Sequence, residues 1–208
     1  MCIRDRLKLK ESGWQKSINK HLRFGGKVIG ICGGYQMLGQ HLNDPHAIES
    51  ELHTQTGFGL LDITTELEPE KQLQKTSGTF IANGFDNINI TGYEIHCGVS
   101  HANSALTNLL SLGADEQSEP NRQDGFINND NNVLGTYLHG LFDQPHACNA
   151  LLKWAGLETG TATDLNALRE NQLDRLADCL QESLRASFWN ELNHEQQHDS
   201  RNNVSTVN

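Results

Sequence analysis

One cysteine in the sequence has neighbours that suit a nucleophile. The motif Gly30-Ile31-Cys32-Gly33-Gly34 ends an apolar run that begins at Lys27. Flanking glycines permit the strained backbone of a tight strand-to-helix turn, which can hold a nucleophile above the edge of a sheet. The positive end of the following helix is expected to favour the Cys32 thiolate, and the N–H of Gly33 can donate to an oxyanion. The same motif is also compatible with a buried cysteine in an ordinary glycine turn.

A histidine far along the chain could act as the base for such a thiol. His139 ends the apolar run 133–138 and is followed by Gly140. A histidine at the carboxyl end of a strand can stand at the same sheet edge as Cys32. A thiol paired with an imidazole is the combination that nucleophilic catalysis by cysteine needs. The Cys32–His139 pair is therefore a hypothesis that depends on the fold to bring the two residues together.

Two further polar residues lie on one predicted strand. Glu94 and His96 alternate within the segment 89–96, so both side chains should point to the same side of that strand. That side could be an active-site face or a face toward a partner domain. It could equally be the polar outer face of a half-exposed strand.

The segments around Cys32 predict a layered α/β fold. Apolar residues recur every four positions over 7–23 and predict a helix, which Gly25-Gly26 would end. The apolar run 27–32 predicts a buried strand, and 35–41 can form the next helix. This order of helix, strand, turn and helix favours a layered, mostly parallel sheet with flanking helices.

The rest of the chain is richer in predicted strands than in helices. Short apolar segments separated by turns that contain Asn, Gly or Asp predict strands over 60–67, 78–81, 89–96, 125–128 and 133–138. Helices are predicted over 144–155 and along a leucine stripe from Leu176 to Leu192. We expect one domain over 7–192 and a disordered polar tail over 193–208.

The composition excludes several classes of function. Of 208 residues, 36% are hydrophobic, and 26 acidic residues against 16 basic ones give a net charge of −10. This balance argues against a protein that binds nucleic-acid phosphates. No apolar run approaches the ~20 residues of a membrane span, and no secretory pattern opens the chain. The five cysteines are scattered without metal-site spacing. We therefore expect a cytoplasmic protein with no metal, no nucleic-acid partner and no membrane partner.

Three motifs, in this order along the chain, resemble one enzyme family. They are GICGGYQMLG (30–39), GYEIH (92–96) and GTYLHGLFD (135–143). Together they strongly resemble the class I glutamine amidotransferase domain of cobyric acid synthases, which are enzymes of cobalamin biosynthesis with a flavodoxin-like fold in this domain. The resemblance extends from about Leu7 to Gly156.

The resemblance implies roles for residues and partners. Cys32 would be the nucleophile and His139 the general base and acid. Gly33 would donate to the oxyanion, and Gln36 would lie near the bound glutamine. In the family, the released ammonia passes to an N-terminal synthetase domain that uses ATP and Mg²⁺ to amidate carboxylates of adenosylcobyrinic acid a,c-diamide. This chain has no G-x-x-x-x-G-K-[ST] motif, so we expect no cofactor in it and expect the synthetase domain and the corrinoid as partners.

The chain departs from the usual pattern of class I amidotransferases. A glutamate two positions after the histidine commonly orients it, and Leu141 occupies that position in this chain. The cobyric acid synthase branch also lacks this acid, so the group that orients His139 is not identified by the sequence. Cys97 stands where the family usually has methionine, and we interpret it as structural. Family members begin this domain further upstream, so we expect it to be incomplete at its N-terminus.

Three alternative functions stay open. An amidotransferase for another substrate, such as the cell-wall precursor lipid II, would share the Cys32 corner. A thiol hydrolase for an unrelated substrate is a second alternative, which Gln36 and its neighbours disfavour. A non-catalytic docking remnant is the third, and alkylation of Cys32 by a glutamine analogue would exclude it.

Overall fold

The computed structural model describes residues 8–85, 87–113, 122–158, 162–184 and 188. The chain divides into two compact units, Met1–Thr163 and Asp164–Asn208. The first unit contains the sheet and all three motifs. The second contains helix α5 (Leu165–Ser183), whose N-terminus is capped by the Asp164 carboxylate. The tail predicted over 193–208 lies outside the described residues, as does the domain boundary predicted at Leu192.

The N-terminal elements follow the predicted order. Helix α2 (Trp14–Arg23) is followed by Gly25, whose φ of +82° lies in the left-handed region that ends helices. Strand β1 (Val28–Ile31) lies within the apolar run, and the short helix α3 (Gly33–Leu38) begins at the residue after Cys32. Apolar side chains of α2 pack against the core cluster that contains the α3 residues. The helix, strand, turn and helix of the prediction are therefore present.

The described strands form one sheet of nine. Its order is β1-β8-β7-β6-β4-β2-β3, and β5 lies off this path, where it pairs with both β4 and β9. The remaining strands are β2 (His41–Asn43), β3 (Thr54–Thr56), β4 (Ile63–Phe80), β5 (Asn89–Ala102), β6 (Thr107–Leu112), β7 (Arg122–Ile127), β8 (Val133–Thr136) and β9 (Leu138–His139). Helix α4 (Pro145–Trp154) follows the last strand and contributes its apolar face to the core.

The prediction of a layered α/β fold is confirmed, but the sheet is mixed instead of mostly parallel. Among the described strands, two of the eight pairings are parallel, β1 with β8 and β2 with β4. A parallel pair needs a long crossover, whereas short turns can join antiparallel neighbours. Short connections of this kind join β4 to β5 and β7 to β8, and both pairs are antiparallel. The prediction of a mostly parallel sheet relied on the helix-rich N-terminal segment. The later segments are joined mainly by turns, and their strands pair mostly antiparallel.

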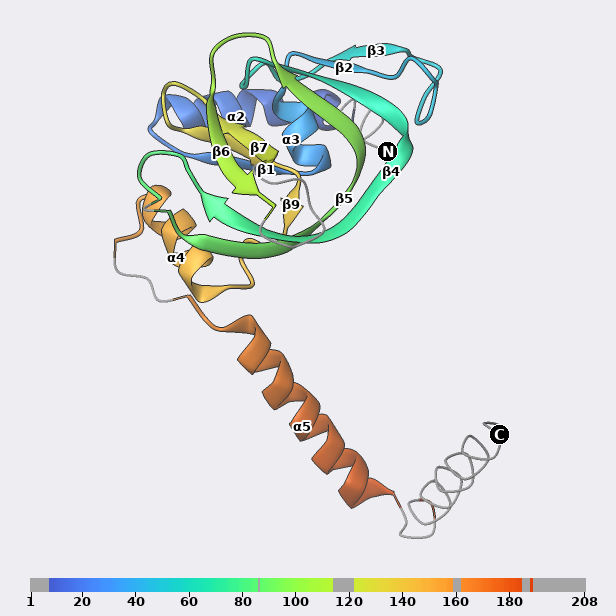
Figure 1. Cartoon of the computed structure of the whole chain (residues 1–208), viewed down its shortest axis with the longest axis vertical. Coiled ribbons are helices and arrows are strands. Elements are labelled where there is room, and N and C mark those ends of the chain that lie inside the picture. Colours follow the sequence, from blue (N-terminus) through green and yellow to red (C-terminus); the bar gives the residue numbers. More distant parts are fainter. Residues whose placement is uncertain (1–7, 86, 114–121, 159–161, 185–187, 189–208) are drawn as a thin grey trace, which may run out of the picture. The chain divides into compact units, whose positions relative to one another are not determined.

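The longest strands were predicted as shorter pieces. The segments 60–67 and 78–81 contribute to one strand, β4, which pairs along its length with β5. The register between them shifts between Leu67 and Gln72, around Pro69, which has no N–H to donate to a ladder. The two strands curve together around one side of the sheet (Figure 1). The GYEIH segment of β5 pairs with both β4 and β9.

Two large apolar clusters form most of the core in the described part of the chain. The larger contains residues of β6, β8, β9 and α4, and it includes Leu141. The smaller is built around Tyr35 on α3, with Val133 on β8 and Tyr137 beyond it. None of the described helices has the length and apolar character needed to cross a membrane. The Cys32 corner and His139 thus stand on elements that are anchored in these two clusters.

Candidate active site

Cys32 occupies a strained corner between β1 and α3. Its backbone has φ +53° and ψ −115°, a conformation that side chains with a Cβ rarely adopt. Its N–H donates to the carbonyl of Thr136 at 2.9 Å, which extends the parallel β1–β8 pairing by one residue. A Cβ at Gly30 would overlap with Leu38 and with the backbone of Gly34, so only glycine fits under the turn. The strand, the glycines and the helix together hold the cysteine in this geometry.

The Cys32 sulfur is a partly buried thiol. Sγ donates to the carbonyl of Ile95 on β5 at 3.3 Å. Burial raises the pKa of Cys32 above its ordinary value, and the N–H of Gly33 opposes that shift without reversing it. The expected preference for the thiolate is therefore not what the structure shows, because loss of water around the sulfur outweighs the effect of the helix N-terminus. In this state the sulfur needs a base to accept its proton.

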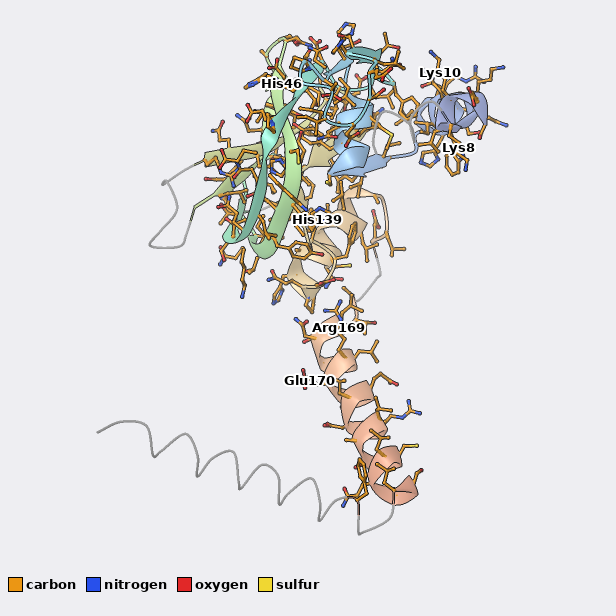
Figure 2. The ribbon with its side chains drawn as sticks, turned by 90° about the vertical axis from the view of Figure 1, so that its right-hand side faces the viewer. Lys8, Lys10, His46, His139, Arg169 and Glu170 are labelled. Carbon is orange, nitrogen blue, oxygen red and sulfur yellow. The ribbon has the colours of Figure 1, made fainter. Side chains whose placement is uncertain are left out.

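His139, which is labelled in Figure 2, lies on β9. It is directly opposite Tyr93 on the long strand β5. Its imidazole stacks on the Tyr93 ring, with 5.1 Å between centroids and 4° between the planes. A Cβ at Gly92 would overlap with the carbonyl oxygen of His139, so this glycine permits the close approach of the strands. Burial, with a smaller contribution from His96, lowers the pKa of His139. The imidazole is therefore neutral near pH 7 and able to accept a proton.

Strand β5 brings Cys32 and His139 to one region. The thiol contacts Ile95, and His139 pairs with Tyr93 two residues away on the same strand. In the described part of the chain, Nε2 of His139 is buried without a hydrogen-bond partner. The imidazole nitrogen is therefore not engaged by another described side chain or backbone group.

Glu94 and His96 lie on the same side of β5, and that side is buried. The exposed fractions of their side chains are 0% and 8%, which excludes the polar outer face of a half-exposed strand. Both guanidinium nitrogens of Arg122 donate to the Glu94 carboxylate, and Gln74 donates to it at 2.9 Å. His96 Nε2 lies 3.6 Å from the same carboxylate, and Nδ1 lies 2.7 Å from the carbonyl of Gly98. Because a carbonyl only accepts, that nitrogen of His96 carries the proton.

The Glu94 carboxylate is ionised over the whole physiological range. Burial alone would raise its pKa, but the neighbouring His96 and the hydrogen bonds from Arg122 and Gln74 outweigh burial and lower the pKa to about 2. Glu94 is therefore a fixed negative charge that organises its neighbours. It makes no contact with Cys32 or His139 among its interactions in the described structure.

Gln36 and Tyr137 form a buried polar chain behind the cysteine. Gln36 Nε2 donates to the Tyr137 hydroxyl at 3.3 Å, and that hydroxyl lies 2.8 Å from the hydroxyl of Ser100. The His96 ring stacks on the Tyr137 ring, with 3.9 Å between centroids. Gln36 Oε1 is buried without a hydrogen-bond partner in the described structure. That oxygen can accept a hydrogen bond from a ligand N–H.

The structure adds residues that the sequence did not single out. Buried Asp124 accepts hydrogen bonds from the Thr136 hydroxyl and from the N–H of Tyr137, the latter at 3.1 Å. The Thr136 hydroxyl also accepts from the N–H of Leu138 at 3.0 Å, so this cluster fixes the bend between β8 and β9 that precedes His139. Burial raises the pKa of Asp124. The adjacent Gly125, at φ +72°, was a usable signal, because a glycine at the start of the strand predicted over 125–128 can indicate an irregularity in the strand.

Leu141, at the position of the usual glutamate, belongs to the larger apolar cluster and is 1% exposed. That position therefore offers no acid beside His139. Among the described residues, no three histidine, cysteine, aspartate or glutamate side chains are grouped as a metal site would require. The groups that the described site offers are a thiol, a neutral imidazole and backbone N–H groups.

Comparison with known proteins identifies the family. In the solved structures, the chain is similar to PurLQS from Thermotoga maritima (16% identity, TM-score 0.48, 67% of each chain covered) and to a glutamine amidotransferase from Thermotoga maritima (14% identity, TM-score 0.41, 69% of this chain and 52% of that chain covered). Residues 2–147 match the family of the CobB/CobQ-like glutamine amidotransferase domain. The chain belongs to this family.

Two curated relatives have considerable sequence identity to the chain. A cobyric acid synthase of Shewanella oneidensis is 53% identical over 184 residues, which cover 85% of this chain. A cobyric acid synthase of Photobacterium profundum is 45% identical over 184 residues, which cover 88% of this chain. The chain spans 36% of the length of each of these relatives. The similarity therefore concerns about a third of each relative.

Proposed function

We propose that this chain is the glutamine-hydrolysing part of a cobyric acid synthase, which supplies ammonia for amidation of a corrinoid. The observation that carries the proposal is the strained Cys32 corner, whose thiol contacts the same strand, β5, that pairs with His139. A cysteine is held at a positive φ only where the surrounding structure compensates for the strain, and such positions cluster at active sites. The 53% identity to a cobyric acid synthase supports the choice of pathway.

The first half of the reaction forms a thioester. His139 Nε2 accepts the Cys32 proton while the sulfur attacks the side-chain carboxamide carbon of glutamine. The backbone N–H of Gly33 donates to the oxyanion that develops on the carboxamide oxygen. The C–N bond then breaks, and His139 returns the proton to the departing ammonia. The pKa directions of the two groups suit this sequence, because a neutral thiol needs a base and a neutral imidazole is one.

The second half releases glutamate. His139 accepts a proton from water, whose oxygen attacks the thioester carbonyl carbon. The C–S bond breaks, and the proton on His139 passes to the departing sulfur, which restores the Cys32 thiol. We assign Gln36 a place near the bound glutamine, and the absence of a hydrogen-bond partner for its Oε1 in the described structure supports this assignment. The cycle thus consumes glutamine and water and yields glutamate and ammonia.

The proposed partners follow from the relatives. Because the chain covers only 36% of each cobyric acid synthase, we propose that the ammonia is used by a synthetase part that binds ATP, Mg²⁺ and the corrinoid. The chain itself would then need no cofactor. Its own substrate would be glutamine, and its proposed location is the cytoplasm.

Labelling with diazo-oxo-norleucine, an electrophilic analogue of glutamine, tests the thiol chemistry. The protein expressed from its complete reading frame should gain one adduct on Cys32, detected by peptide mass spectrometry, and excess glutamine should protect it. Cys148→Ala should label normally, because Cys148 lies on α4 away from the motif. Failure to label Cys32 would support a docking module instead. Labelling that glutamine does not prevent would support a thiol hydrolase for an unrelated substrate.

Substrate assays distinguish the corrinoid pathway from other amidotransferases. The same protein should form amide product from adenosylcobyrinic acid a,c-diamide, ATP and glutamine. It should not amidate lipid II under the same conditions. Amidation of lipid II, but not of the corrinoid, would overturn the proposed pathway while leaving the glutamine chemistry intact.

A further inference from the structure

The imidazole of His139 lacks the support that this position usually provides. Leu141 occupies the place of the customary glutamate and packs in the apolar cluster. The buried Nε2 of His139 has no hydrogen-bond partner in the described part of the chain. A general base must nevertheless be held within a narrow range of orientations to meet its proton. Another contact must therefore limit the rotation of this ring.

The Tyr93 ring makes that contact. Tyr93 and His139 are direct cross-strand partners in the antiparallel β5–β9 pair. Their rings are parallel to within 4°, with 5.1 Å between centroids, which is the offset stacked arrangement that aromatic rings favour. Gly92, the residue before Tyr93, has no Cβ to collide with the carbonyl oxygen of His139. In the GYEIH motif, Gly92 therefore permits the backbones of β5 and β9 to approach closely, and Tyr93 supplies the ring that contacts His139.

We propose that Tyr93 is a positioning residue for glutamine hydrolysis: its ring holds the plane of the His139 imidazole in the orientation that proton exchange with the Cys32 thiol and the leaving ammonia requires. This inference rests on the proposed function. The stacked ring also faces the imidazolium that forms when His139 accepts a proton, and the face of an aromatic ring attracts a cation at this distance. The contact thus supplies orientation and some stabilisation of charge, as a hydrogen-bonded carboxylate does in other amidotransferases.

Two substitutions separate the ring from the hydroxyl. Tyr93→Phe keeps the stacked ring and should keep kcat for glutamate release within a few-fold of the wild-type value. Tyr93→Leu keeps an apolar side chain but removes the flat ring, and it should lower kcat by about 10- to 100-fold. KM for glutamine should stay nearly unchanged in both variants, because the proposed role is in orienting the base and not in holding the substrate. Glutamate release is measured with the protein from the complete reading frame.

Controls keep the test independent of folding and of the proposed function. The Tyr93 side chain is 44% exposed, so removal of its ring should alter stability little. Trp14→Leu is the matched control, because it removes another exposed ring (55% exposed) from helix α2. Should Tyr93→Leu unfold, Tyr93→Thr places a residue with good strand propensity at the same position without a ring.

The outcomes separate the inference from the proposed function. The positioning role would be overturned if Tyr93→Leu had the same kcat as the wild type, or if the Phe and Leu variants lost kcat equally. In either case an active wild-type protein would leave the proposed function in place. A wild-type protein without glutaminase activity would overturn the proposed function, and this inference with it. A loss of kcat in the Leu and Thr variants, recovered in the Phe variant, supports the role of the ring.

Discussion

The two sides of the candidate site are built in different ways. On the cysteine side, one continuous motif makes the geometry: glycines permit the turn, and Cys32 takes a positive φ at the end of β1. On the histidine side, His139 depends on residues from several strands, including Tyr93 on β5 and Asp124 on β7. The difference shows that a motif can encode a strained corner by itself, while the position of a partner side chain needs the whole sheet.

The same physical effect shifts the pKa values of the two sides in opposite directions. Burial raises the pKa of the Cys32 thiol and lowers the pKa of the His139 imidazole, because loss of water disfavours the charged form of each group. The resting pair is therefore neutral on both sides. In the proposed mechanism, transfer of the thiol proton to the imidazole accompanies attack on the substrate, so any change that misplaces either side should slow the reaction.

Removal of the cysteine should have the largest effect and would test whether that side alone carries the nucleophile. Cys32→Ala should abolish amidation that depends on glutamine, because the thioester needs the Cys32 sulfur. Amidation supported by added ammonium salts should survive, since this route bypasses glutamine hydrolysis. Both rates are measured in the protein from the complete reading frame, with Cys148→Ala as the control. Loss of both activities would indicate that Cys32 has a structural role.

Removal of the histidine should have the next largest effect and would test whether the two sides act together. His139→Ala should lower kcat for glutamate release by about 10²- to 10⁴-fold, the usual contribution of a positioned acid–base group. Glutamine binding should be largely retained. Isothermal titration calorimetry of the Cys32→Ala, His139→Ala double variant, compared with Cys32→Ala alone, measures it without turnover. Activity within a few-fold of wild type would remove His139 from the mechanism and direct attention to His96.

Glycine substitutions compare the backbone on the two sides. Gly92→Ala should lower the free energy of unfolding by about 1–3 kcal/mol, because its new Cβ would overlap with the carbonyl oxygen of His139 and force β5 from β9. Gly34→Ala, beside the cysteine corner, should leave stability almost unchanged, since the space around its Cβ is open. Urea denaturation of the two variants gives both values. Equal losses would show that the cysteine corner is as tightly packed as the β5–β9 contact.

The smallest expected effect concerns the fixed charge on the histidine side. The Glu94 carboxyl has an ordinary pKa of 4.5 and a pKa of about 2 in the folded state. Between these values the unfolded chain binds a proton that the folded chain does not, so the contribution of Glu94 to stability is present above the upper value and is lost as pH falls toward the lower one. Glu94→Gln should therefore make stability less dependent on pH between about pH 5 and pH 2.

Urea denaturation at several pH values measures this dependence. Glu68→Gln, at an exposed position of β4, is the matched control for the removal of one carboxylate. The control should keep the wild-type dependence on pH. An unchanged dependence in Glu94→Gln would mean that the contacts with Arg122 and Gln74 do not hold the carboxylate in its ionised form.

The local features of the sequence were sufficient for the N-terminal part of the fold. Four-residue periodicity predicted a helix that includes α2, an apolar run predicted β1, and a glycine-flanked cysteine predicted the turn into α3. These features depend on contacts between residues close in sequence, and each is expressed in local backbone preferences. The strained conformation of Cys32 follows from the same five residues, since the glycines that permit it are its close neighbours.

Only the tertiary structure decided how the later strands pair and which side chains meet. Three features depend on the register between strands that are distant in sequence. They are the joining of two predicted segments into β4, the predominance of antiparallel pairs, and the contact of Tyr93 with His139. Arg122 reaches Glu94 across the same sheet and helps to fix its charge, although nothing near either residue in the sequence indicates the other. Register is set by the summed burial and hydrogen bonding of whole strands, and a motif of a few residues contains too little of that energy to reveal it.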